Sequence, residues 1–481
     1  MRGNDQTVIF RPLILAAVLI VIVTATTACL GGGPRVTGSD PAPQADPVQV
    51  DQAVEIYFDE PMDPATLADA VTIEPGPPGP APRLDLAADG RSLTVTPSPA
   101  WAPDTDYTLA VGREAQSAEG RPLRRDHQLT FTTAPPRTVT CARPRFSPAG
   151  DHVAWLETTA DGAGELWASA TAAPSPRRLL TDVPAGCDFA WLPDGTGLVA
   201  VTTKLPGDED SPNRPTVVRV DLADGAVEPL ALNAELQSPG RLLFRFSPDG
   251  QHLVVQNDMY LADAHSDYVR QLGVARGDGT GFVPCGNLLV GWSQGGANLL
   301  YLDMPGIGEG HDFDYSLYSC DLAAGTVGPV TGAGKVNNFG AAARSPDGAW
   351  FAYSDWQAEE VALPDGLTIA RLPRDLWLMP GEGGPPRRLT QDQGHNADPA
   401  WGPDGQLFFA ANRGDELGWD VWLMESVSEP QEAVNVTARA GYDGQPDLFG
   451  ESIVLVSDAS GAQEVWLTDP AGDAWQMLSG R

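Results

Sequence analysis

A tetrapeptide of the type Ser-Pro-Asp-Gly recurs through the last two-thirds of this chain. Its copies end at Gly150, Gly195, Gly250, Gly296, Gly348 and Gly405, and a degenerate copy ends at Gly450. Successive glycines are 45 to 57 residues apart. A repeat of roughly 40 to 50 residues is typical of one blade of a β-propeller. The spacing predicts seven blades, and the missing Pro-Asp pair in the seventh copy leaves six as an alternative.

Each repeat has the same order of segments: a short apolar strand, the turn, a second strand, a variable loop and a third strand. In the fifth repeat, AAARSPDG is followed by AWFAYSDW and then by DLWLMPGEGG. Ser345, Pro346, Asp347 and Gly348 have the residue preferences of a tight turn, with glycine where the backbone becomes left-handed. Since such units pack as small antiparallel sheets around an axis, the predicted fold class is all-β.

These repeats also resemble a known family. The run PAWGPDGQLFFAANRGDELGWDVWLME, together with FSPDG and RRLT elsewhere, is similar to the WD40-like repeats of TolB-type β-propeller proteins. The likeness covers residues 136–481 and implies a propeller of six or seven blades.

The first residues have the features of an export signal. Arg2 and Arg11 precede an apolar run from Leu13 to Val23, and small polar residues then lead to Cys29. This pattern predicts a signal peptide over residues 1–28. The residues before Cys29 resemble a bacterial lipobox, which implies lipidation of Cys29, although Thr26 replaces the usual aliphatic residue. A plain signal peptide and an uncleaved membrane anchor remain the alternatives.

A tether and a separate domain are expected between Cys29 and the propeller. Residues 29–45 are rich in Gly, Pro, Asp and Ser and are predicted to be a flexible tether. Residues 46–135 alternate between apolar and polar positions, with turn signals, as in a small β-sandwich. The phrases YFDEPMDPATL, APDTDYTL and LTFTT resemble the bacterial Ig-like domain of surface-layer proteins, which implies a spacer or adhesive module without catalytic residues.

Four cysteines follow Cys29. An even number is compatible with two disulfides in an oxidising compartment. The propeller register suggests one disulfide between Cys141 and Cys187 and another between Cys285 and Cys320. Four buried free thiols are the alternative.

The charge of the chain restricts its partners. The formal net charge is −34, so a nucleic-acid partner is excluded, because binding phosphates needs a basic surface. Oxygen ligands for calcium occur in the loops Gly207–Asn213 and Glu309–Tyr315, but neither has the spacing of a calcium loop. We therefore expect no cofactor and no metal site, with calcium as the alternative.

One motif is typical of an enzyme. Ser293 lies in a G-x-S-x-G sequence, but it also occupies the turn position of Ser247 and Ser345. A nucleophile elbow requires a strand, a turn and a helix in an α/β domain. We therefore predict no catalytic residue. A propeller lyase or hydrolase acting on envelope polymers remains the alternative, although a lyase channel would be expected to collect several histidines or basic residues.

A polar rim is predicted at one mouth of the propeller channel, where the innermost strands begin. Its candidate residues come from four repeats and are Asp188, Asn337, Asn338, His395, Asn396, Asp443 and Gln445. A concave mouth with a few polar groups is a typical binding site. The alternative is that these side chains only bond neighbouring backbone amides. Trp356 and Trp419, in variable loops, are further candidates for partner contact.

The sequence thus favours a membrane-tethered extracytoplasmic lipoprotein of the bacterial periplasm or cell surface. Its propeller would bind a protein or glycan of the cell envelope through the channel mouth and loops. An enzyme and a purely structural envelope component are the alternatives.

Overall fold

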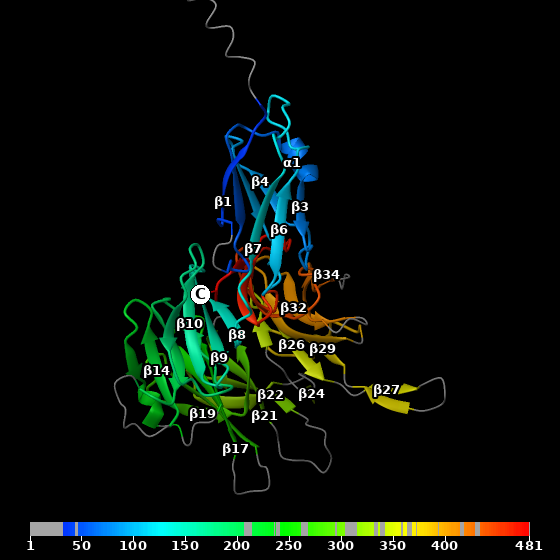
Figure 1. The fold of residues 1–481 in the computed structure, drawn as a ribbon. Helices are drawn as coiled ribbons and strands as arrows, with labels where there is room; N and C mark the ends of the chain where they lie inside the picture. Colours follow the sequence, from blue (N-terminus) through cyan, green and yellow to red (C-terminus); the bar gives the residue numbers. More distant parts are fainter. Residues whose placement is uncertain are drawn as a thin grey trace, which may run out of the picture.

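The computed structural model describes residues 32–480 except 44–46, 206–213, 235, 237–240, 261–267, 294–295, 304–314, 331–334, 337–341, 357–358, 363–367, 372, 393, 414–417 and 429–432. Within these residues the chain forms a β-sandwich and a larger propeller, which lies below the sandwich in Figure 1. The predicted all-β fold class is confirmed.

The sandwich consists of two antiparallel sheets, with strand orders β1-β2-β5-β4 and β3-β6-β7. Their strands are β1 (Val36–Asp40), β2 (Val54–Phe58), β3 (Val71–Glu74), β4 (Arg83–Leu86), β5 (Ser92–Thr96), β6 (Asp106–Val111) and β7 (His127–Thr132). Helix α1 (Pro64–Ala70) is capped by Asp63, whose carboxylate accepts a hydrogen bond from the Ala65 backbone N–H. Trp101, Tyr107 and Phe131 form an aromatic cluster in the core between the sheets.

The sandwich begins earlier in the chain than the sequence suggested. Strand β1 falls within the segment that we expected to be part of the flexible tether, and it pairs with β2 along its length. Its residues VTGSD do not alternate clearly between apolar and polar, and the strand is an edge strand held by backbone hydrogen bonds. Such a strand leaves little signal in the hydrophobic pattern.

Seven four-stranded blades follow in the described part of the chain, so the count of seven is correct. The strands of the first three blades are β8 (Val139–Phe146), β9 (His152–Thr159), β10 (Gly164–Ala170) and β11 (Arg177–Leu180); β12 (Ala190–Trp191), β13 (Gly197–Thr202), β14 (Thr216–Asp221) and β15 (Val227–Pro229); β16 (Arg241–Phe246), β17 (His252–Tyr260), β18 (Tyr268–Arg276) and β19 (Val283–Gly286). A short 3-10 helix, η1 (Ala231–Ala234), connects the second and third blades.

The remaining four blades follow the same plan. Their strands are β20 (Leu288–Trp292), β21 (Asn298–Asp303), β22 (Tyr315–Asp321) and β23 (Thr326–Pro329); β25 (Ala342–Arg344), β26 (Trp350–Trp356), β29 (Arg374–Pro380) and β30 (Arg387–Arg388); β31 (His395–Trp401), β32 (Leu407–Asn412), β33 (Asp420–Met424) and β34 (Val434–Asn435); β35 (Asp443–Phe449), β36 (Ser452–Ser457), β37 (Glu464–Thr468) and β38 (Gln476–Met477). Strand β24 (Lys335–Val336) pairs with β22, and the hairpin of β27 (Glu359–Ala362) and β28 (Thr368–Arg371) extends from the edge of the propeller (Figure 1).

The repeated turn has the predicted backbone chemistry. In the third blade Gly250 has a φ of +71° and donates its N–H to the Ser247 carbonyl at 2.9 Å. The Ser247 hydroxyl donates to Asp249 at 2.6 Å and accepts from the His252 backbone N–H at 2.9 Å. The serine and aspartate of the repeat therefore hold the turn between the first two strands of a blade.

Neighbouring blades share apolar cores, and the ring is complete. One cluster joins blades one, two and three, and others join the later blades in succession. Strand β8 of the first blade contacts β35, β36 and β37 of the last. The sandwich docks on this closing blade, because Val50 and Ala100 pack into the cluster that includes Ile453 and Trp466.

Candidate functional site

Three of the innermost strands contain a β-bulge of the same kind. At each bulge a polar residue falls outside the regular strand pairing. Arg143, Asp398 and Gln445 each precede a proline, and each has a positive φ, of 55°, 48° and 54°. The pairing register shifts at each of these places in β8, β31 and β35. A bulge of this kind re-aims a side chain, and a non-glycine residue with positive φ is a strained conformation that clusters at functional sites.

The three bulges are connected to one another around the ring. The Gln445 side-chain oxygen accepts a hydrogen bond from the Arg143 backbone N–H at 2.6 Å. The Asp398 carboxyl accepts from the Gln445 backbone N–H. Asp447, two residues beyond the last bulge, accepts from the Phe146 backbone N–H at 2.9 Å. The side chains of blades six and seven thus satisfy backbone donors of the next blade.

A buried carboxylate continues this network into the second and third blades. Asp188 has a side-chain exposure of only 1%, and its oxygen Oδ2 lies 2.8 Å from Arg145, 3.2 Å from Arg245 and 3.3 Å from Arg143. Burial alone would raise the pKa of Asp188, but the charges of Arg145, Arg245 and Arg143 outweigh it and hold the pKa well below its usual range. Asp188 is therefore an anion that positions three guanidinium groups.

We call the connected set of side chains from blades one, two, three, six and seven the channel collar. It comprises Arg143, Arg145, Asp188, Arg245, Asp398, Gln445 and Asp447.

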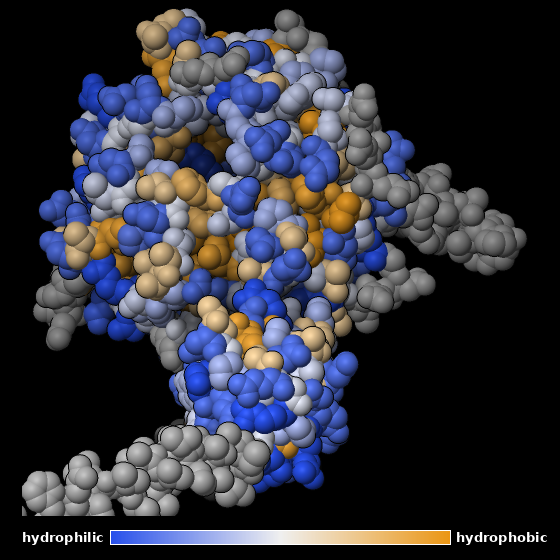
Figure 2. All heavy atoms as spheres, turned by 90° about the horizontal axis from the view of Figure 1, so that it is seen from above, coloured by the Kyte–Doolittle hydropathy of each residue, from blue (hydrophilic) through white to orange (hydrophobic). Residues whose placement is uncertain are grey.

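The collar is accessible to water. Arg245 keeps 43% of its side chain exposed, although the positive charge of Arg145 and burial lower its pKa to about 10 against the attraction of Asp188. An arginine that is exposed to water and also close to other charged side chains is expected in a narrow channel. Figure 2 shows a hollow in the propeller on the side of the sandwich, with hydrophilic residues at its bottom.

The structure brings two of the seven predicted rim residues together. Asp188 and Gln445 both belong to the collar and are linked through Arg143. Asn337 and Asn338 lie outside the described residues.

Two of the other three predicted rim residues have local partners in their own parts of the sixth and seventh blades. Asn396 is buried and donates to Asp392 at 2.9 Å. Asp443 is buried and pairs with Arg439 at 2.9 Å, and burial raises its pKa to about 6. These partners are neighbouring side chains rather than the backbone amides of the alternative, but the contacts are likewise local.

His395 differs from its neighbours because it is exposed at the start of β31. Its ring centroid lies 5.5 Å from that of Trp356, which is 36% exposed, and the Arg374 guanidinium lies 5.5 Å from the same indole. Trp419 is only half-buried and donates its backbone N–H to Gly441. His395 and Trp356 thus form a small aromatic patch beside the channel mouth.

Sequence reasoning missed the arginines of the collar. Arg145 and Arg245 stand two residues before the serine of the repeated turn, in RFSPAG and RFSPDG, and Arg143 precedes a proline. The repetition of Arg-Phe-Ser-Pro was a usable signal. The rim was predicted only at the starts of the innermost strands, whereas the collar lies further along them. The positive φ of Arg143 has no signature in the sequence.

Ser293 has the structure of a turn residue rather than of a nucleophile. It is 1% exposed, donates its N–H to the Asn298 carbonyl at 2.8 Å and accepts from the Asn298 N–H at 3.0 Å. Gly296, which ends this turn, has a φ of +75°. Within the residues that the structure describes, no group of three or more His, Cys, Asp or Glu side chains is placed to hold a metal ion. The loop Gly207–Asn213 and, except for Tyr315, the loop Glu309–Tyr315 lie outside those residues.

The cysteines are thiols in this structure. Cys285 and Cys320 have their sulfur atoms 3.7 Å apart, whereas Cys141 lies 4.0 Å from Glu157. Disulfide formation therefore stays a prediction.

Comparison with a family model identifies the first domain. The model of the bacterial Ig-like domain matches residues 32–133, a range that includes β1. The sandwich is a bacterial Ig-like domain. Such a domain, joined here to a propeller, indicates an envelope-associated, extracytoplasmic bacterial protein.

No curated protein matches this sequence. No helix within the described ranges is long and apolar enough to cross a bilayer.

Solved structures are similar to the propeller in fold. The β-propeller domain of the Trilobed protease from Pyrococcus furiosus, which has an open velcro topology, matches with a TM-score of 0.50 and 12% identity over 72% of this chain and 99% of that one. Pyrococcus horikoshii acylaminoacyl peptidase matches with a TM-score of 0.50 and 13% identity over 71% of this chain and 52% of the peptidase. TolB from Acinetobacter baumannii matches with a TM-score of 0.38 and 14% identity, over 79% and 82%. At these identities the first two matches support the propeller fold and carry no information about activity.

Proposed function

We propose that this protein is a membrane-tethered, extracytoplasmic binding protein. In this proposal Cys29 carries the lipid anchor, the Ig-like domain is a spacer, and the channel mouth and loops of the propeller bind a protein or glycan of the cell envelope.

The channel collar is the observation that carries the proposal. Its arginines are held by Asp188 and by main-chain contacts, yet they remain accessible to water. A buried polar network that ends in accessible charged groups is a preorganised recognition site, because its side chains lose little freedom when a ligand binds. A purely structural component would have no use for accessible charges inside the channel.

Binding is favoured over catalysis by the composition of the collar. The guanidinium groups can stabilise negative charge, which meets part of what a lyase channel requires. However, the collar as described contains no histidine or lysine, and its two carboxyls of raised pKa, Asp398 and Asp447, are already engaged by backbone N–H groups of the neighbouring blade rather than left free as a general base. No contact of the described residues favours the enzyme alternative.

Site-specific photo-crosslinking on intact envelopes tests the proposal. A photoreactive amino acid in place of His395, which is exposed beside the mouth, should yield a discrete adduct. The matched control replaces Val283, which is 59% exposed on the outer strand β19, and should give none. Identical adduct patterns at the two positions, or no adduct at His395, would refute binding at the mouth.

A further inference from the structure

The collar reverses the charge that dominates the molecule. The chain has a formal net charge of −34, but three arginines surround the single carboxylate of Asp188. Asp447 is the next acidic group, and burial raises its pKa. Asp398 is the third acidic group of the collar, and burial raises its pKa as well. With all three carboxyls ionised the collar itself is neutral, and the nearby Arg374, whose charge acts on Asp398, adds one positive charge. The channel is therefore attractive to anions at a place where the rest of the protein repels them.

The guanidinium groups are not saturated by protein acceptors. Arg245 uses only Nη1, which donates to Asp188 and to the Phe244 carbonyl; among the contacts of the described residues its Nε and Nη2 have none. The Arg143 guanidinium likewise contacts Asp188 only through Nη1. The Arg245 and Arg143 side chains are 43% and 28% exposed, so water can reach them.

These donors match one class of ligand. The planar fork of an arginine binds a carboxylate through two parallel hydrogen bonds, and charge-assisted bonds of this kind are stronger than neutral ones. A bound anion would also relieve the repulsion between Arg145 and Arg245, which the Asp188 carboxylate offsets only in part. Clusters of arginines are a recurrent means of recognising acidic peptide motifs.

We propose that the collar binds a carboxylate of an acidic peptide segment, an inference that rests on the proposed binding function and names its ligand. An acidic side chain brings its carboxylate on a narrow, flexible stem that can enter a channel. The aromatic ring against Arg145 is Phe189, at 5.2 Å, and it is fully buried, so it offers no face on which a sugar ring could pack. The collar thus favours an acidic peptide over an acidic glycan.

Calorimetric titration with defined probes tests the inference on the full-length protein. An N-acetylated tri-glutamate peptide should bind at low salt and weaken as salt is added, since screening reduces the attraction. A tri-glutamine peptide should not bind. Arg245→Gln should weaken tri-glutamate at least about tenfold, as expected for the loss of a charge-assisted pair. Arg219→Gln is the control, because Arg219 is exposed on the outer face of β14.

The outcomes separate this inference from the proposed function. Equal binding of tri-glutamine, or tri-glutamate binding unchanged in Arg245→Gln, would overturn it. Binding of a trigalacturonate but not of tri-glutamate would show a glycan ligand, and binding of inorganic phosphate alone would show a generic anion site; either overturns the peptide assignment. If Arg245→Gln lowers the melting temperature, Arg245→Lys serves as a second variant, because it keeps the charge but lacks the two parallel donors of a guanidinium. Arg245→Lys should fold and bind tri-glutamate with intermediate affinity. If tri-glutamate does not bind but the photoreactive residue at position 395 still gives its adduct, the proposed binding function is supported and only the assignment of an acidic peptide as ligand is refuted.

Discussion

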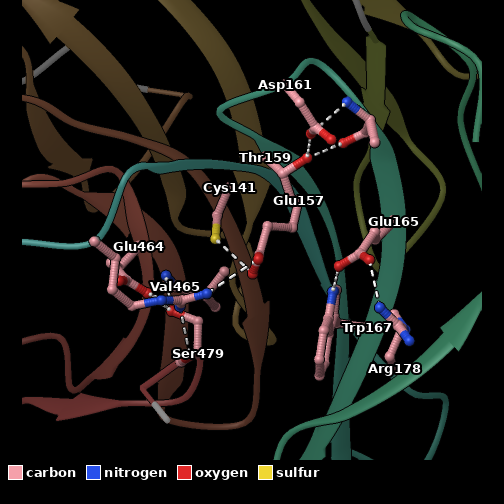
Figure 3. A network of polar contacts seen from close by, with 12 residues as sticks. Cys141, Glu157, Thr159, Asp161, Glu165, Trp167, Arg178, Glu464, Val465 and Ser479 are labelled. Carbon is pink, nitrogen blue, oxygen red and sulfur yellow. Dashed lines mark hydrogen bonds and ion pairs between the residues drawn. The ribbon is translucent and has the colours of Figure 1, made fainter. Parts of the chain in front are cut away.

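Arg137 and Glu464 are 327 residues apart in the sequence and form an ion pair of 2.9 Å. The same guanidinium donates to the Ser479 carbonyl at 2.7 Å and contacts Glu157 at 3.0 Å. Figure 3 labels Glu157, Glu464 and Ser479, its three partners. Every blade takes its four strands from one continuous segment, so no strand is shared between the first and last blades. Besides apolar packing and the hydrogen bonds of the collar, the ring is closed by this cluster and by the bridge between Thr140 and Gln463.

We expect Arg137→Gln to destabilise the propeller by about 3 kcal/mol, because it leaves two buried carboxylates without their common counter-charge. Urea unfolding followed by tryptophan fluorescence measures the loss. Arg178→Gln is the control, since Arg178 pairs with Glu165 in the same blade but is 51% exposed (Figure 3). It should cost at most about 1 kcal/mol. Equal losses for the two variants would contradict a closing role for Arg137.

The same cluster predicts where the two domains can be separated. A propeller fragment that starts at Pro135 keeps Arg137, whereas one that starts at Val139 loses it. We expect the longer fragment to unfold cooperatively and the shorter one to be less stable by about the same 3 kcal/mol. Equal stability of the two fragments, measured by calorimetry, would show that the Arg137 cluster does not contribute to closing the ring.

Cys285 and Cys320 are predicted to form a disulfide between the third and fourth blades when the protein matures in an oxidising compartment. Their sulfur atoms are neighbours in the fold, and the loop between them spans 35 residues. Burial and the neighbouring Cys320 raise the pKa of Cys285 to about 12, so the folded Cys285 thiol ionises poorly. We therefore expect the bond to form during folding, by exchange with the disulfide of an oxidoreductase, which takes up the two electrons.

Peptide mapping without reduction tests this pairing. A peptide pair linking Cys285 to Cys320 should be found, while Cys141 and Cys187 should be alkylated after unfolding. Cys320→Ser should lower stability by about 3 kcal/mol under oxidising conditions and much less after reduction of both proteins. A Cys141–Cys187 link, or alkylation of all four thiols, would contradict the prediction.

Asp443 should make stability depend on pH. Burial is the main reason that its folded pKa lies near 6, above the usual value of 3.8, while Arg439 opposes the shift. A raised folded pKa means that the native state binds the proton more tightly, so this contribution is present below pH 4 and is lost as the pH rises through 6. Relative to Asp443→Asn, the wild type should lose about 2 kcal/mol between pH 4 and pH 7. Urea unfolding at both pH values measures this difference. A constant difference would refute it.

Much of the fold could be predicted because it depends on local turn chemistry. The glycine of the tetrapeptide closes the turn in each of the first six repeats as Gly250 does, by donating its N–H to the carbonyl three residues earlier, so the blades could be counted from the sequence. The collar could not be predicted in this way. The bulge at Arg143 exists because Gln445 of the last blade accepts its N–H, and a contact between residues 302 apart leaves no local pattern. Asp188 was predicted as a rim residue from its position, but its three arginine partners come from two other blades.

The anchoring of the protein rests on Cys29, which lies outside the described residues. If Cys29 is lipidated, Cys29→Ser should move the protein from the membrane fraction to the soluble fraction, because the acyl chains that hold it are lost while both domains are unchanged. Fractionation followed by immunoblotting measures the shift, and metabolic labelling with a fatty acid should mark the wild type but not the variant. Cys320→Ser is the matched control and should remain in the membrane fraction. Full membrane retention of Cys29→Ser would indicate instead that the apolar run from Leu13 to Val23 stays attached as an uncleaved anchor.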